Sequence, residues 1–181
     1  MRIFALAVAF ISLFTARSAF AQGVFFSEGA SGSAIACVPM SSATWPVPWT
    51  QTHGKVIHNG TTTQDVVLFC PVAIDTIAIP SGGPVGGSQP MTVMTVKYVD
   101  PDGTGSQANV LAELKYADAA GNMVELAVAS SSAQSSNATG ISTMDANISQ
   151  TPVNGGHLFV QLTIHRTTSS LVPAVYGYSL H

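Results

Sequence analysis

The chain has 181 residues and a formal net charge of −3, and only 8% of its residues are charged. This length fits one domain with a sizeable core. The scarcity of Lys and Arg excludes nucleic acids and anionic membrane surfaces as partners, because both are bound by clustered positive charge. Few charges also leave sheet edges weakly protected, so self-association is one expectation.

The N-terminal segment has the three parts of a secretory signal peptide. Arg2 supplies positive charge, Ile3–Phe14 form an apolar run of twelve residues, and Ala19-Phe20-Ala21 offers a cleavage site. The run is shorter than the about 20 residues that span a bilayer. We predict a signal peptide over residues 1–21 and one domain over residues 22–181, secreted or periplasmic, with no membrane span. An uncleaved anchor is the alternative. The mature chain has four positive and nine negative side chains, a net charge of −5.

Cys37 and Cys70 are the two cysteines of the chain. In an exported protein such a pair predicts a disulfide. Closing a loop of about 34 residues would stabilise the fold by about 3–4 kcal/mol, through restriction of the unfolded chain. Thiolates for a metal or for catalysis are the alternative, and oxidising surroundings oppose it.

The remainder alternates apolar and polar residues with the period of β-strands, without helical periodicity. Segment 129–151 is polar and predicts one short edge strand or a long crossover. Eight or nine short strands with a disulfide indicate an all-β fold, a single antiparallel β-sandwich, with a jelly roll as one possible topology. The clearer predicted strands are Asp65–Val72, Ile74–Ile79, Met91–Val99, Asn109–Ala117, Met123–Ala129, His157–Arg166 and Leu171–Leu180, and the shorter candidates are Gly23–Ser27, Ser33–Val38 and Gly54–His58.

The clearest predicted hairpin joins Asn109–Ala117 to Met123–Ala129 through a turn with Asp, Gly and Asn. One register makes one face wholly apolar and places Lys115 opposite Glu125, an exposed ion pair worth about 0–1 kcal/mol. The pairs of this register are Ala117–Met123, Tyr116–Val124, Leu114–Leu126 and Ala112–Val128.

Histidine and serine patterns indicate no particular catalytic chemistry. The histidines are His53, His58, His157, His165 and His181, and their spacing matches no HxH or HExxH metal motif. We expect them to be exposed or to cap backbone groups. No G-x-S-x-G or S-x-x-K motif occurs. A hydrolase whose site is assembled from separated loops stays an alternative.

Asp100-Pro101-Asp102-Gly103 resembles part of a calcium-binding loop. A complete EF-hand pattern needs a glutamate at its twelfth position, where this chain has Leu111. A plain turn is therefore the favoured interpretation, with Asp100 and Asp102 kept as Ca²⁺ candidates; no other metal or cofactor is predicted.

Trp45-Pro46-Val47-Pro48-Trp49 is the most suggestive surface motif. Exposed Trp45 and Trp49 would suit stacking on sugar rings, as in a carbohydrate-binding module. A polyproline II segment would place them about 12 Å apart and around the axis from each other, which favours at least one indole covering the core. Asn59, Asn137 and Asn147 begin glycosylation sequons, from which we draw no prediction.

The stretch from Cys37 (CVPM) through Gly54 and Asn59-Gly60 to Cys70-Pro71 (FCPV), with the Tyr176-Gly177-Tyr178 ending, resembles small exported bacterial proteins of uncharacterised function. The resemblance implies a disulfide-pinned β-sandwich in the periplasm or outside the cell, and it transfers no activity and no site residues. We therefore expect a non-enzymatic protein for binding or for surface assembly. A carbohydrate-binding module and a hydrolase are the alternatives.

Overall fold

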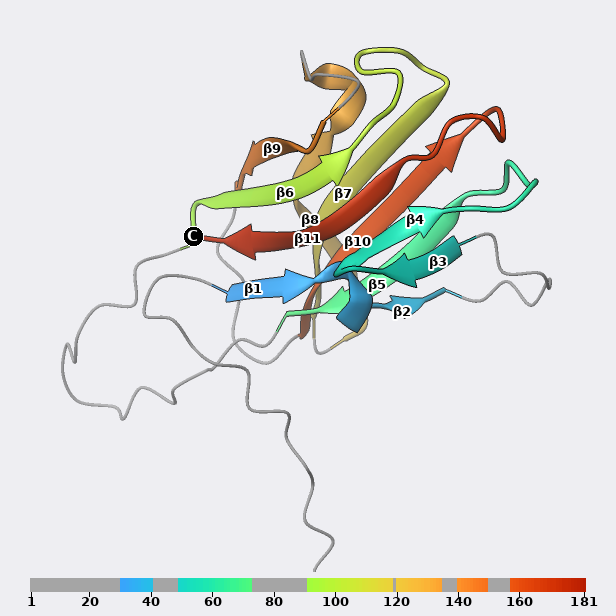
Figure 1. Cartoon of the computed structure of the whole chain (residues 1–181). Helices are drawn as coiled ribbons and strands as arrows, with labels where there is room; N and C mark the ends of the chain where they lie inside the picture. The colour runs from blue at the N-terminus through green and yellow to red at the C-terminus, as the bar shows by residue number, and fades with distance from the viewer. Residues whose placement is uncertain (1–29, 41–48, 73–90, 119, 135–139, 150–156) are drawn as a thin grey trace, which may run out of the picture.

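The computed structural model describes residues 30–40, 49–72, 91–118, 120–134, 140–149 and 157–181, which form strands and two single-turn 3-10 helices (Figure 1). The elements are β1 (Ala30–Ser33), η1 (Ala34–Ala36), β2 (Val38–Pro39), β3 (Trp49–Thr52), β4 (Lys55–His58), β5 (Val66–Pro71), β6 (Val93–Val99), β7 (Ala108–Ala117), β8 (Met123–Ser130), η2 (Ser131–Ala133), β9 (Ser142–Asn147), β10 (His157–Arg166) and β11 (Ala174–Leu180). Within these residues no helix is long and apolar enough to cross a membrane.

Two antiparallel sheets make up the fold. Sheet A has the order β3-β4-β11-β6-β9, with β1 also paired to β11, and sheet B has the order β2-β5-β10-β7-β8. Four antiparallel strand pairs are nested inside one another along the chain: β4–β11, β5–β10, β6–β9 and, innermost, the hairpin β7–β8. This nesting across two sheets is the jelly-roll arrangement. The predicted all-β antiparallel sandwich is confirmed, and its topology is a jelly roll.

The core lies between the sheets and follows from period-2 alternation. Strands β7 and β10 each run for ten residues, and every second side chain is buried. Each fully buried aliphatic side chain contributes about 1.5–3 kcal/mol relative to an exposed one. The predicted buried row of β10 is confirmed; it consists of Leu158, Val160, Leu162 and Ile164.

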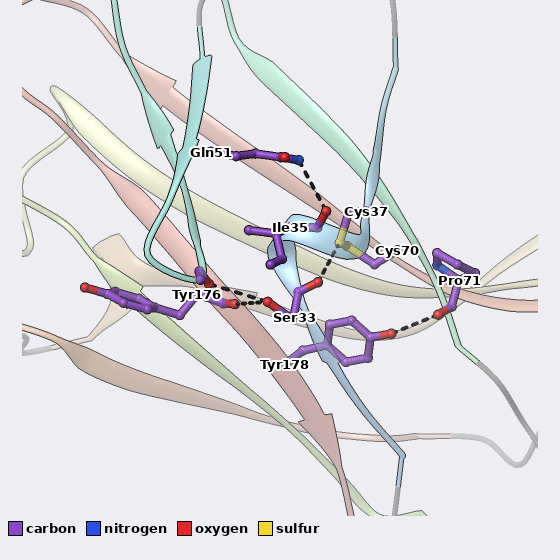
Figure 2. Close-up of a disulfide and its surroundings, with 9 residues drawn as sticks. Ser33, Ile35, Cys37, Gln51, Cys70, Pro71, Tyr176 and Tyr178 are labelled. Carbon is purple, nitrogen blue, oxygen red and sulfur yellow. Dashed lines mark hydrogen bonds between the residues drawn. A yellow bond between two sulfur atoms is a disulfide. The ribbon is translucent and has the colours of Figure 1, made fainter. Parts of the chain in front are cut away.

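The predicted disulfide is confirmed. Cys37 and Cys70 are bonded at an S–S distance of 2.02 Å, and both are buried. Cys37 follows η1, which continues from β1 of sheet A, whereas Cys70 belongs to β5 of sheet B. Cys37 directly precedes β2, which pairs with β5, so the bond fixes the segment that crosses from β1 of sheet A onto sheet B (Figure 2).

The predicted β7–β8 hairpin forms, but its register is only half right. Tyr116 pairs with Val124 as predicted, and then a bulge shifts Leu114 onto Ala127 and Ala112 onto Ala129. The physical reason is that Leu126 and Ala127 are both buried, so β8 needs an extra residue to turn two consecutive side chains inward.

The predicted placement of Lys115 opposite Glu125 is confirmed, but the ion pair expected between these two side chains does not form. The Lys115 ammonium lies 3.0 Å from the Glu113 carboxylate, two residues away on the same strand. Glu113 and Lys115 share the outer face of β7, and Gln161 of β10 bridges them by donating to Glu113 at 2.7 Å.

Other strand predictions differ in detail. Segment Ser33–Val38 is interrupted by η1, and β3 was not predicted. Strand β3 reaches β4 through a two-residue turn in which His53 and Gly54 both have positive φ, as a type I′ hairpin requires. The polar segment 129–151 supplies edge strand β9. The predicted signal peptide and the strands Gly23–Ser27 and Ile74–Ile79 lie outside the described residues.

Candidate functional site

An open groove of about 320 Å³ lies on the outer face of sheet A. It runs along the middle of the neighbouring strands β11 and β6. The inward side chains of these two strands pack into the core on the opposite face of the sheet. The lining residues are Gly32, Thr95, Lys97, Thr143, Tyr176, Gly177, Tyr178 and Ser179.

A bulge in β11 creates the aromatic feature of this groove. Val175 pairs with Tyr98 and Gly177 with Lys97, so Tyr176 is an extra residue in the ladder. The rings of Tyr176 and Tyr178 point in different directions in Figure 2. Tyr178 is buried and donates to the Pro71 carbonyl oxygen at 3.0 Å, whereas Tyr176 is half-buried and lies among the groove residues.

Two lysines face the Tyr176 ring. Lys55 comes from β4 and Lys97 from β6, which pair with β11 on its two sides. Their Nζ atoms lie 5.4 Å and 5.7 Å from the centroid of the ring. Both are cation–π distances, worth about 0.5–1 kcal/mol each at exposed positions. Within the described residues neither ammonium lies within 4.0 Å of a carboxylate oxygen.

Hydroxyl groups line the groove beside Lys97. Thr95, Thr143 and Ser179 line the same groove, and Thr95 donates to the Asp145 carboxylate at 2.6 Å. Asp145 faces outward on edge strand β9, opposite Thr95. The arrangement offers positive charge, hydroxyl donors and acceptors, and one carboxylate, which is a set suited to holding a polar ligand.

Strand β1 forms one side of the groove and packs closely. A Cβ atom at Gly32 would lie 2.6 Å from the Tyr178 ring, and one at Gly177 would collide with the Gly32 carbonyl oxygen. The Ser33 hydroxyl donates to the carbonyl oxygens of Gly54 at 3.4 Å and Tyr176 at 3.5 Å. Burial raises the pKa of Tyr178 to about 12, so this phenol stays neutral at physiological pH.

The structure brings the two predicted Ca²⁺ candidates together with a serine. Asp100 is buried and accepts a hydrogen bond of 2.5 Å from the Ser131 hydroxyl. Asp102 accepts from the backbone N–H groups of Gln107 at 2.7 Å and Ala108 at 3.1 Å. Protein donors thus hold both carboxylates, and the segment forms turns as the favoured interpretation expected. Whether Ca²⁺ binds there stays a prediction.

The two carboxyl groups differ in their affinity for a proton. Desolvation by burial, with a further contribution from Asp102, raises the pKa of Asp100 to about 6, against the opposing hydrogen bond from Ser131. Desolvation also acts to raise the pKa of Asp102, but hydrogen bonds from Asp100 and from backbone N–H groups outweigh it and lower that pKa. Asp100 is therefore the group that holds the proton of this pair.

Arg166 is the last residue of the predicted strand His157–Arg166, and its side chain is buried, with 1% exposed. Its guanidinium donates to the carbonyl oxygens of two loops, β4–β5 and β10–β11, with distances of 2.8 Å to Gly60 and 3.0 Å to Leu171. Buried His58 lies beside it, and its ring nitrogen Nε2 is 2.7 Å from the Gln64 carbonyl oxygen, so of the two expected environments this histidine has the contact with a backbone group and not the exposed one. The further acceptors of Arg166 are the carbonyl oxygens of His58, Asn59, Thr62 and Ser169.

The predicted tryptophan pair is only partly described. Trp49 is half-buried, packs against the core and pairs with His58 in the β3–β4 ladder, which agrees with the core-covering interpretation. Trp45 lies outside the described residues. The sugar-stacking role of the two indoles stays a prediction. Of the sequons, Asn59 and Asn147 are exposed, and Asn137 lies outside the described residues.

The parts of a hydrolytic site are dispersed in the part of the chain that the structure describes. His165 contacts Asp65 at 2.6 Å on the surface, and no hydroxyl among the described residues hydrogen bonds to this histidine. The Ser131 hydroxyl is buried and accepts the Val110 N–H at 2.8 Å while donating to Asp100. Among the described residues no three His, Cys, Asp or Glu side chains are arranged to hold a metal ion.

Comparison with known proteins leaves the family open. No protein-family model matches the sequence, and no curated protein or solved structure is detectably similar to the chain. Any functional proposal therefore rests on the residues of the groove and on the fold that positions them.

Proposed function

We propose that the chain is an exported, non-enzymatic binding protein that holds its ligand in the groove beside Tyr176. The observation that supports this is the open groove itself, which is lined by Lys97, by several hydroxyls and by Tyr176, whose ring also lies near the Lys55 ammonium. A jelly roll is also the fold of many lectin domains, which is an analogy at the level of fold alone.

Three observations support export. The first 21 residues have the composition of a signal peptide. The Cys37–Cys70 bond is of the kind that persists in oxidising compartments. The resemblance to small exported bacterial proteins points in the same direction, to the periplasm or the cell exterior.

The proposal is tested with the exported product of the full chain, purified and applied to an array of neutral and acidic polysaccharides. Thr143 is an exposed groove residue, so Thr143→Trp should fill the groove and weaken binding at least about tenfold. The matched control is Thr163→Trp on the outer face of sheet B, which should bind as the unchanged protein does. Binding to no polymer, or equal binding by Thr143→Trp, would contradict the proposal.

A further inference from the structure

We infer that the groove recognises an acidic polysaccharide, a glycan with sparsely spaced carboxylate groups, through Lys55 and Lys97. This inference rests on the proposed function because it concerns the same groove. It adds the charge of the ligand and the two lysines that bind the charged groups. It also adds an experiment that distinguishes recognition of charge from binding in the groove alone.

The distribution of positive charge carries the first step. Outside residues 1–21 the chain has four cationic side chains, Lys55, Lys97, Lys115 and Arg166. Arg166 is buried and donates to backbone carbonyl oxygens, and Lys115 is paired with Glu113 at 3.0 Å. The two remaining cations are therefore the two that converge on Tyr176, from strands on both sides of β11.

Placing two like charges around one ring is unfavourable unless something compensates. The negative face of an aromatic ring compensates in part, and it also holds both ammonium groups near a common point. Because no carboxylate of the described residues pairs with Lys55 or Lys97, their hydrogen-bonding capacity is left for an external anion. Tyr176 is thus a positioning residue for two anion-binding groups.

The surroundings decide which anion fits. Residues 22–181 have a net charge of −5. The Asp145 carboxylate lies beside the groove, where it accepts a hydrogen bond from the groove residue Thr95. A densely charged polyanion such as a nucleic acid would be repelled by this field, whereas isolated carboxylates meet the two lysines locally. The hydroxyls of Thr95, Thr143 and Ser179, with the Asp145 carboxylate, suit the hydroxyl groups of sugars.

One polymer in two charge states provides the test. The exported protein is titrated with a polygalacturonate that is mostly methyl-esterified, so that its free carboxylates are sparse, and with the same polymer after complete methyl esterification, which removes the remaining charge and keeps the sugars. We expect tighter binding to the acidic form, and weaker binding as salt is raised. Lys55→Met and Lys97→Met should each weaken binding to the acidic form roughly three- to tenfold. Lys115→Met, a lysine of sheet B that is already paired, is the matched control and should change nothing.

The outcomes separate this inference from the proposed function. Equal affinity for the two forms, or unchanged binding by both groove-lysine variants, would overturn the recognition of charge. If Thr143→Trp still abolished that binding, the groove would remain the binding site and only its preference for an anion would fail. Binding of neither form together with no binding on the array would overturn both.

Discussion

At the scale of single residues, the most informative group is the buried carboxyl of Asp100. Its pKa is raised to about 6, chiefly by desolvation, while an unfolded chain would have an aspartate pKa of about 3.9. The folded state thus binds this proton more tightly than the unfolded state. The resulting stabilisation is complete below about pH 4 and is lost as the pH rises through about 6.

Asp100→Asn keeps the shape of the side chain and removes its charge. We expect the variant to match the unchanged protein near pH 4 and to become more stable than it at pH 7, by an amount on the order of 1–3 kcal/mol. Urea unfolding at several pH values measures this difference. Burial lowers the pKa of His58, which gives an opposite trend below about pH 6.5, but both proteins contain His58 and its contribution cancels. A difference that stays constant between pH 4 and pH 7 would contradict the assignment.

Arg166 shows what residue-level reading can and cannot predict. Alternation along His157–Arg166 places residue 166 in the same inward row as Leu158 and Ile164, so the pattern contained the burial. The charge of the side chain pointed to exposure instead. What decides is a set of backbone carbonyl oxygens from two loops, and their convergence depends on tertiary structure.

At the scale of elements, the attachment of β1 to β11 depends on a close approach of the two strands. A Cβ atom at Gly177 would collide with the Gly32 carbonyl oxygen. Gly177→Ala should therefore loosen β1, with a loss of about 1–3 kcal/mol in the free energy of unfolding. Urea unfolding measures this loss, and amide hydrogen exchange over Ala30–Ser33 should become faster.

Gly140 provides the control for this substitution. A Cβ atom there would have no neighbour within 4 Å, so Gly140→Ala should leave both measurements unchanged. If Gly177→Ala were as stable as Gly140→Ala and equally protected over β1, the close approach would not matter for the fold.

Most strands could be predicted from alternation, because burial on one face imposes a period of two. The bulges at Tyr176 and at Leu126 could not, since each inserts one residue into a ladder and breaks that period. The groove depends on the first of these bulges. Lys97 of the groove and Lys55 beside it belong to predicted strands, but nothing in their spacing indicated that they meet at the Tyr176 ring.

At the scale of the whole molecule, both edge strands of sheet B expose apolar side chains. Val38 is 63% exposed beside β5, and Met123 on β8 is 55% exposed. Edges with little charge favour pairing between molecules. We expect light scattering after size exclusion to show species larger than one chain, increasing with protein concentration.

Charge placed on one edge should oppose this association. Val38→Lys is expected to shift the population toward the monomer, whereas Val172→Lys, at an exposed position in the β10–β11 loop, should not. A protein that is monomeric at every concentration would rule out self-association through these edges.

The sequence offered the jelly roll as one topology among others. It could not single this topology out, because the order of the strands in each sheet is not encoded locally. Strand order depends on pairings between segments far apart in the chain, such as Val175 with Val56, and local patterns do not encode these partners. The disulfide was predictable because the chain has two cysteines, whereas its position beside the β2–β5 strand pair was visible only in the fold.

The central place of β11 in sheet A has a consequence for the timing of folding. The last strand in chain order inserts between β4 and β6, so the earlier strands of this sheet have no middle partner until Ala174–Leu180 arrive. A growing or translocating polypeptide must keep its apolar rows apart from wrong partners throughout that delay. Completion of sheet A thus depends on β11, and a product truncated before Ala174 would leave β4 and β6 without the strand that joins them.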